Sequence, residues 1–86
     1  MSHDCSHTIS HDMRYPFDAR GIAKRFRHAA IFGAFDALQP GETMLFCNDH
    51  DPLPLLAQLT QHYGSAIEIN YVTREPGKIV IEFNRK

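Results

Sequence analysis

The sequence has few of the residues that mark several large protein classes. It contains no tryptophan, two cysteines, and 9 Lys and Arg against 10 Asp and Glu, for a net charge of −1. This balance argues against general nucleic-acid binding, which needs a basic surface to release counterions. Cys5 and Cys47 form neither a CxxC pair nor a disulfide framework. A reducing cytoplasm is therefore the expected location.

Long apolar runs are also missing from the sequence. No segment approaches the roughly 20 residues that cross a bilayer. The first 13 residues, MSHDCSHTISHDM, lack the apolar region of a secretory signal. A chain of 86 residues is long enough for one domain with a small core. We expect a single-domain cytoplasmic protein that binds neither membranes nor nucleic acids.

The composition changes near residue 14. Residues 1–13 are polar and histidine-rich, which predicts a flexible tail, and residues 14–86 have the pattern of a globular domain. His3, His7 and His11 are spaced by four within the tail. Because nothing there would hold a helix in water, we expect at most adventitious metal binding by these side chains.

Apolar spacing in the domain predicts six elements. In chain order they are an edge strand at residues 15–20, a helix at 28–38, a central strand at 42–48, a helix after Pro52, and two alternating strands at 66–72 and 78–84. Helices with one apolar face pack on a sheet that has one apolar and one solvent-exposed face, which gives two layers. The order βαβαββ therefore predicts an α/β (α+β) two-layer sandwich whose first two strands are parallel.

Two short motifs carry a resemblance to a known fold. DARG at residues 18–21 and PGE at residues 40–42 resemble the small sulfur-carrier proteins of the TusA/SirA-like family. In that family a Cys-Pro-x-Pro motif starts the first helix three residues after the glycine, and its cysteine carries a persulfide. Here Lys24 stands at the cysteine position, and Arg25 and Arg27 stand at the proline positions. The nucleophile of the sulfur carriers is therefore absent.

A more specific pattern resembles an uncharacterised NDHDP family of unknown function with the same fold. The matching residues are His28, Ile31-Phe32, Asp36-Ala37-Leu38, Pro40-Gly41-Glu42, Asn48 to Pro52, Leu55-Leu56 and Gln58-Leu59. The resemblance implies a mixed four-stranded sheet of order 1-2-4-3, with two helices on one face. Some family members are joined to hemerythrin-like domains, which implies a redox-related protein partner. The resemblance implies no reaction.

The segment Asp49-His50-Asp51 has two interpretations. Asp51 could cap the second helix by accepting from the Leu53 amide, worth about 1 kcal/mol, with Pro52 at the first helical position. Capping does not explain His50 or the second acid. The alternative is a site, because the carboxyl ends of parallel strands share an edge where ligands often bind.

That edge would bring the two strand–helix loops together. The predicted ligand or partner edge consists of Arg20, His28, Asn48, Asp49, His50 and Asp51. Within it, His28, His50, Asp49 and Asp51 are a plausible ligand set for zinc or iron. Capping, metal binding, and small-molecule or partner binding all remain open.

Two further candidates lie near this edge. Lys24, Arg25 and Arg27 form a predicted anion or partner patch at the amino end of the first helix, unless they pair with Asp49 and Asp51. Cys47 is a possible redox residue at the end of the second strand. Neighbouring carboxylates would raise its thiol pKa, which opposes thiolate chemistry, and buried cysteines are commonly small core residues.

We expect a non-catalytic binding or adaptor module in redox-linked metabolism. Its partner would be another protein, redox-active or hemerythrin-like, that docks on the predicted edge. A redox or sulfur-transfer protein acting through Cys47 is one alternative. A small His/Asp metal-binding protein, with zinc or iron, is the other.

Overall fold

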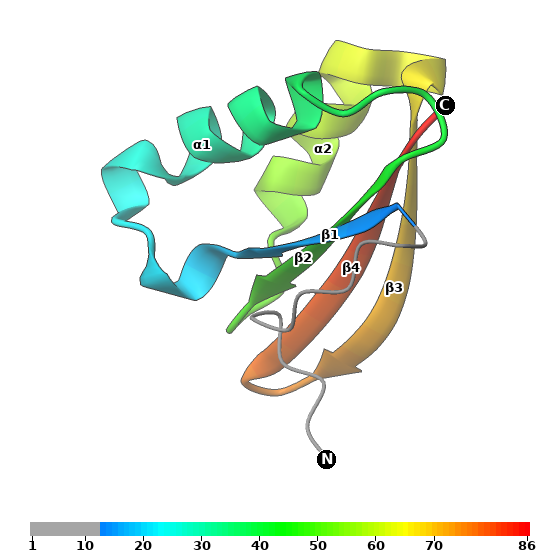
Figure 1. The fold of residues 1–86 in the computed structure, drawn as a ribbon. Coiled ribbons are helices and arrows are strands. Elements are labelled where there is room, and N and C mark those ends of the chain that lie inside the picture. The colour runs from blue at the N-terminus through cyan, green and yellow to red at the C-terminus, as the bar shows by residue number, and fades with distance from the viewer. Residues whose placement is uncertain (1–12) are drawn as a thin grey trace.

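The computed structural model describes residues 13–86, which form a four-stranded sheet with two helices against one face (Figure 1). The elements are β1 (Arg14–Asp18), the 3-10 turn η1 (Ala19–Gly21), α1 (Lys24–Asp36), β2 (Thr43–Asn48), α2 (Leu53–Tyr63), the 3-10 turn η2 (Gly64–Ala66), β3 (Ile67–Glu75) and β4 (Lys78–Arg85). The predicted tail lies outside the described residues, except for Met13. No helix within residues 13–86 is long and apolar enough to cross a membrane.

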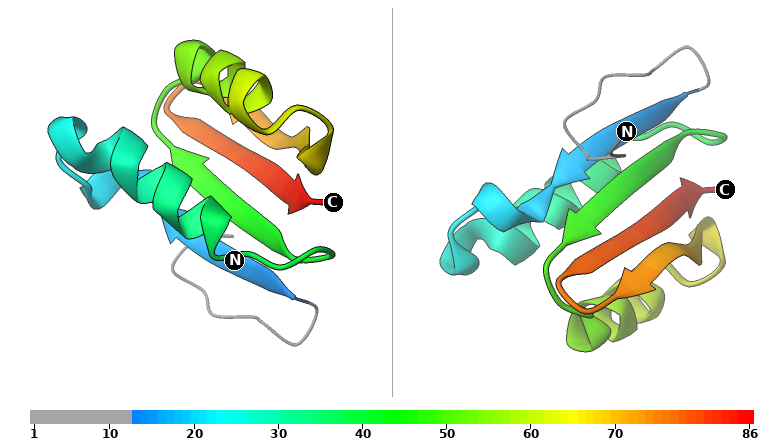
Figure 2. Two further views of the ribbon diagram at one scale, coloured as in Figure 1. Left: turned by 90° about the horizontal axis from the view of Figure 1, so that it is seen from above. Right: turned by 90° about the horizontal axis from the view of Figure 1, so that it is seen from below.

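The strand order in the sheet is β1-β2-β4-β3. β2 runs parallel to β1 and antiparallel to β4, and β3 is antiparallel to β4. Both helices cover the same face of the sheet, and the other face carries neither of them (Figure 2). These observations confirm the predicted two-layer α+β sandwich and its strand order. Because β1 and β2 are parallel, their carboxyl ends lie at the same edge of the sheet.

The core lies between the helices and the sheet. β2 contributes Met44 and Phe46, and β4 contributes alternate residues that point to the same side. The helices add buried residues four apart, which lie on one face of each helix. The buried cluster is Ala19, Ile31, Phe35, Met44, Phe46, Leu55, Leu59, Ile67, Ile79, Ile81 and Phe83. Burying each large apolar side chain contributes roughly 1.5–3 kcal/mol.

Two predicted boundaries were wrong. α1 begins at Lys24, one turn before the predicted start at His28. Three of its first four residues are basic and the fourth, Phe26, is exposed, so the spacing of core-facing apolar residues could not detect this turn. β1 ends at Asp18, before the predicted end at Arg20, because Ala19–Gly21 form a 3-10 turn. The Asp18 carboxylate caps that turn by accepting from the Arg20 amide at 3.0 Å.

The predicted capping of α2 by Asp51 was also wrong. α2 begins at Leu53, with Pro52 at the N-cap position and no side chain capping the helix. The Pro52 carbonyl accepts from the Leu56 amide at 3.0 Å, the first hydrogen bond of the helix. Pro54 fits in the first turn because amides there have no intrahelical acceptor. The Asp51 carboxylate points elsewhere.

Candidate functional site

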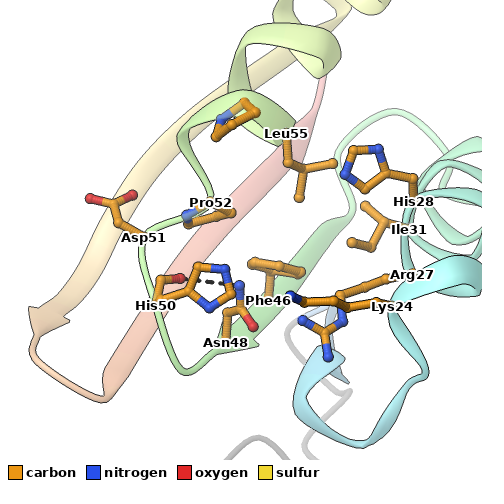
Figure 3. Close-up of a pocket in the computed structure, with 11 residues that line it drawn as sticks. Lys24, Arg27, His28, Ile31, Phe46, Asn48, His50, Asp51, Pro52 and Leu55 are labelled. Carbon is orange, nitrogen blue, oxygen red and sulfur yellow. Dashed lines mark hydrogen bonds between the residues drawn. The ribbon is translucent and has the colours of Figure 1, made fainter.

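A cavity of about 410 Å³ lies between α1 and the loop that joins β2 to α2. The lining residues come from three places in the chain (Figure 3). They are Lys24, Arg27, His28 and Ile31 of α1, Phe46 and Asn48 of β2, and His50, Asp51, Pro52, Pro54 and Leu55 of the loop and α2. The cavity is therefore at the edge where the sequence predicted a site.

α1 supplies the cationic wall of this cavity. Arg27 and His28 come three and four positions after Lys24, and Ile31 comes three after His28, so the four share one face of the helix. The Arg27 guanidinium donates to the Ile22 carbonyl from Nε at 3.2 Å and from Nη2 at 2.9 Å. These bonds attach the preceding loop to the helix. None of the three cationic or imidazole side chains forms an ion pair within residues 13–86.

Asn48 forms the polar part of the opposite wall. Its side chain is 3 % exposed, and its Nδ2 donates to the His50 carbonyl at 3.1 Å. Flipping the amide would put two acceptors against each other, so this bond sets its orientation. Oδ1 then has no hydrogen-bond partner among the described residues. Figure 3 shows the oxygen on the side of the α1 cations. An unsatisfied buried acceptor costs about 1–3 kcal/mol.

Asp51 reaches the cavity rim but its carboxylate turns toward β3. Oδ1 accepts from the Tyr71 hydroxyl at 2.5 Å, and Oδ2 accepts from Nε of Arg74 at 2.8 Å. Figure 3 shows the carboxylate pointing away from the cavity. Burial, and then the hydrogen bond to Asp51, raise the pKa of Tyr71. Asp51 therefore attaches the loop to β3, and its ion pair is with Arg74 rather than with the predicted α1 patch.

A β-bulge makes this attachment possible. The pairing of β3 with β4 shifts by one residue between Tyr71 and Thr73, so Tyr71 lies opposite Ile81 and Arg74 opposite Ile79. In a regular strand, residues 71 and 74 would point to opposite faces of the sheet. The extra residue brings both to the side of Asp51. Sequence reasoning missed Arg74 for this reason.

Asp49 and His50 interact with each other at the outer rim. His50 Nδ1 and Asp49 Oδ1 are 2.7 Å apart, and their side chains are 62 % and 60 % exposed. The hydrogen bond to His50 is the main reason that the pKa of Asp49 is lowered. His50 lines the cavity, whereas Asp49 lies on a neighbouring hollow toward the β3–β4 turn.

The predicted metal ligands are not gathered around one point. Within residues 13–86, no three His, Cys, Asp or Glu side chains are grouped so that they could hold a metal ion. Asp49 is bonded to His50, and Asp51 to Tyr71 and Arg74. The zinc or iron hypothesis for His28, His50, Asp49 and Asp51 stays a prediction without support from this geometry.

Two predicted cations lie outside the cavity lining. Arg20 donates to Asp18 from Nε at 2.8 Å and from Nη2 at 2.7 Å. The hydrogen bond from Arg20 is the main cause of the lowered pKa of Asp18. The Arg25 guanidinium lies 5.2 Å from the centre of the Phe26 ring. Of the predicted patch, only Lys24 and Arg27 line the cavity.

Cys47 does not line the cavity. It is 4 % exposed, and it packs with Val80 and Leu45 on the opposite face of the sheet from Phe46. It is not a free thiol in this structure. A redox role for Cys47 stays a prediction that this buried position does not favour.

These features define the class of protein as a two-layer α+β domain with a basic cavity at the carboxyl edge of its parallel strands. The chain belongs to the uncharacterized conserved protein family DUF2249, whose family model matches residues 16–85. That range includes every residue that lines the cavity. No curated protein and no solved structure matches the chain. The likeness to the TusA/SirA-like proteins stays an expectation.

Proposed function

We propose that this domain is a non-catalytic binding module that works through the cavity between α1 and the β2–α2 loop. The observation that carries the proposal is the Asn48 carbonyl oxygen, which is buried in the cavity wall with no partner in residues 13–86. A buried polar group without a partner is rare and needs a reason. A ligand that donates a hydrogen bond to this oxygen would be its missing partner.

The lining residues favour binding, although His28 and His50 are imidazoles of the kind that act as acids or bases. Within residues 13–86 the lining residues include no serine, threonine or cysteine that could act as a nucleophile. Their single carboxylate, on Asp51, already accepts from Tyr71 and Arg74, so it is poorly placed to act as a base. Lys24 lies in an exposed position, without the enclosed apolar pocket that activates a catalytic amine.

The partner predicted from the family resemblance belongs to this proposal. A redox or hemerythrin-like protein would act with the domain in redox-linked metabolism, and the cavity would then hold a ligand that such a partner releases or senses. Phe26 and Leu53, which adjoin lining residues in the sequence, are 57 % and 56 % exposed and could add apolar contact area.

The test is amide NMR of the full chain with a soluble cell extract, separated into a small-molecule fraction and a protein fraction. We expect one fraction to shift the Asn48 side-chain amide and the backbone amides of Arg27, His28 and His50 in a saturable way. Lys24→Gln should weaken the effect, and Lys86→Gln, a charge change at the C-terminus, should not. The small molecules in that fraction should be the same before and after incubation with the protein, because a binding module does not convert its ligand. Shifts confined to other residues, or none from either fraction, would contradict the proposal.

A further inference from the structure

We infer that the cavity binds a small aliphatic 2-hydroxycarboxylate, with its carboxylate at the α1 cations, its hydroxyl at Asn48 and its chain on the apolar floor. The inference rests on the proposed function and names the ligand class for the same site. Three features of the cavity wall lead to this chemistry.

The first feature is positive charge that no ion pair within residues 13–86 neutralises, although Arg27 is close enough to Asp49 to help His50 lower the pKa of that carboxyl. Lys24 and Arg27 line the cavity and form no ion pair within residues 13–86. The nearest lining carboxylate, on Asp51, is paired with Arg74 on β3. The Arg27 guanidinium uses Nε and Nη2 on the Ile22 carbonyl, a neutral acceptor that leaves its charge in place. A carboxylate would be attracted to this wall.

The second feature is the acceptor on the facing wall. The bond from Asn48 Nδ2 to the His50 carbonyl leaves Oδ1 as a buried acceptor in the cavity wall, without a partner among the described residues. A carboxylate oxygen is an acceptor, so it cannot satisfy Oδ1. A ligand ammonium could donate, but it would lie among Lys24 and Arg27, which repel it. A neutral hydroxyl next to the carboxylate meets both requirements.

The third feature is the apolar floor. Ile31, Phe46 and Leu55 are almost fully buried side chains that line the bottom of the cavity, and Pro52 and Pro54 complete the wall at the start of α2. An inorganic oxyanion would have no favourable contact with these apolar groups. A short aliphatic chain would cover it, and a volume of about 410 Å³ is in the range of small-ligand sites.

The experiment compares three matched probes by amide NMR of the full chain. The probes are 2-hydroxy-4-methylpentanoate, 4-methylpentanoate, which lacks the hydroxyl, and 2-hydroxy-4-methylpentanamide, which lacks the charge. We expect the hydroxy acid to give saturable shifts at Phe46, Asn48 and His50. Each of the other probes should bind about tenfold more weakly, because each loses one polar interaction.

Two variants assign these differences to residues. Asn48→Leu keeps the approximate size of the side chain and should abolish the preference for the hydroxy acid over 4-methylpentanoate. Lys24→Gln should weaken both acids by the same factor, about threefold to tenfold, without changing their ratio. Lys86→Gln is the control for charge. If Asn48→Leu fails to fold, the three probes on the native chain still decide the question.

Each other outcome overturns a defined part of the inference. If the two acids bind with equal affinity, the proposed role of Asn48 is wrong. If 2-hydroxy-4-methylpentanamide binds as tightly as 2-hydroxy-4-methylpentanoate, the proposed role of the cations is wrong. If none of the three probes shifts the cavity residues but a cell-extract fraction does, the ligand class is wrong and the binding module stands. If the extract also has no effect there, the proposed function fails as well.

Discussion

The two ends of the sheet carry similar motifs, an acid and a proline in a tight loop, but they differ in how their polar groups are satisfied. At the PGE end, the Gly41 amide donates to the Arg85 carbonyl at 2.8 Å and the Arg85 amide donates to the Glu42 carbonyl at 2.9 Å. Glu42 Oε1 accepts from the Gln39 amide at 2.8 Å. At the NDHDP end, Asn48 Oδ1 has no partner among the described residues.

At the PGE end, Arg85 Nη1 is also buried, and no described residue forms a hydrogen bond with it. Its guanidinium lies over the rings of Phe35 and Tyr63, at 5.2 Å and 5.6 Å from their centres. The ring faces stabilise the charge. Asn48 Oδ1 has neither a ring nor a hydrogen-bond partner among the described residues. The PGE loop therefore pairs its polar groups within the fold, whereas the NDHDP loop keeps a buried acceptor without a partner among the described residues.

The largest effect should come from breaking the attachment of the NDHDP loop. Asp51→Ala removes the acceptor for Tyr71 and Arg74, which should lower the free energy of unfolding by about 1–3 kcal/mol. Urea denaturation measures this loss. Asp51→Asn keeps an acceptor for Tyr71, so its loss should be smaller. Equal stability of Asp51→Ala and the native chain would show that this attachment does not hold the loop.

The next effect tests whether the PGE end is purely structural. Gly41 has a φ of 94°, a conformation that L side chains rarely adopt, although no atom lies within 4 Å of an added Cβ. Gly41→Ala should therefore lower the free energy of unfolding by about 1–2 kcal/mol through backbone strain alone. The affinity of Gly41→Ala for 2-hydroxy-4-methylpentanoate should equal that of the native chain. A weaker affinity measured by the same NMR titration would mean that the two ends are coupled.

The smallest effect concerns Tyr63, which lies near the PGE end and donates to Asp36 at 2.5 Å. Burial, and then this hydrogen bond, raise the pKa of Tyr63 from 10.0 to about 12. Below pH 10 the phenol is protonated in both folded and unfolded chains, and its contribution to stability is complete. Between about pH 10 and pH 12 only the unfolded chain ionises there, so stability should fall.

Urea denaturation across this alkaline range measures the fall. Tyr63→Phe is the control and should show a shallower dependence on pH. The remaining slope should come in part from Tyr15 and Tyr71, whose pKa values are also raised. An identical slope in Tyr63→Phe would contradict the assignment to Tyr63.

The candidate site was only partly predictable from the sequence. His28, Asn48 and His50 were expected at one edge because parallel strands bring their carboxyl ends together, and all three line the cavity. Arg20 was expected there too, but its guanidinium is bonded to Asp18, two residues earlier. The apolar floor of Ile31, Phe46 and Leu55 was not recognised as part of a site, because apolar spacing assigns such residues to the core.

The sequence by itself determined the order of helices and strands and the layer to which each apolar residue belongs. Those properties follow from local spacing, which sets the face of a helix or strand. The strand order was implied by the family resemblance. Only the tertiary structure decided where Asp51 points and which polar groups keep no partner. A bulge in β3 directs Tyr71 and Arg74 to Asp51, and this long-range contact turns the Asp51 carboxylate away from Lys24 and Arg27.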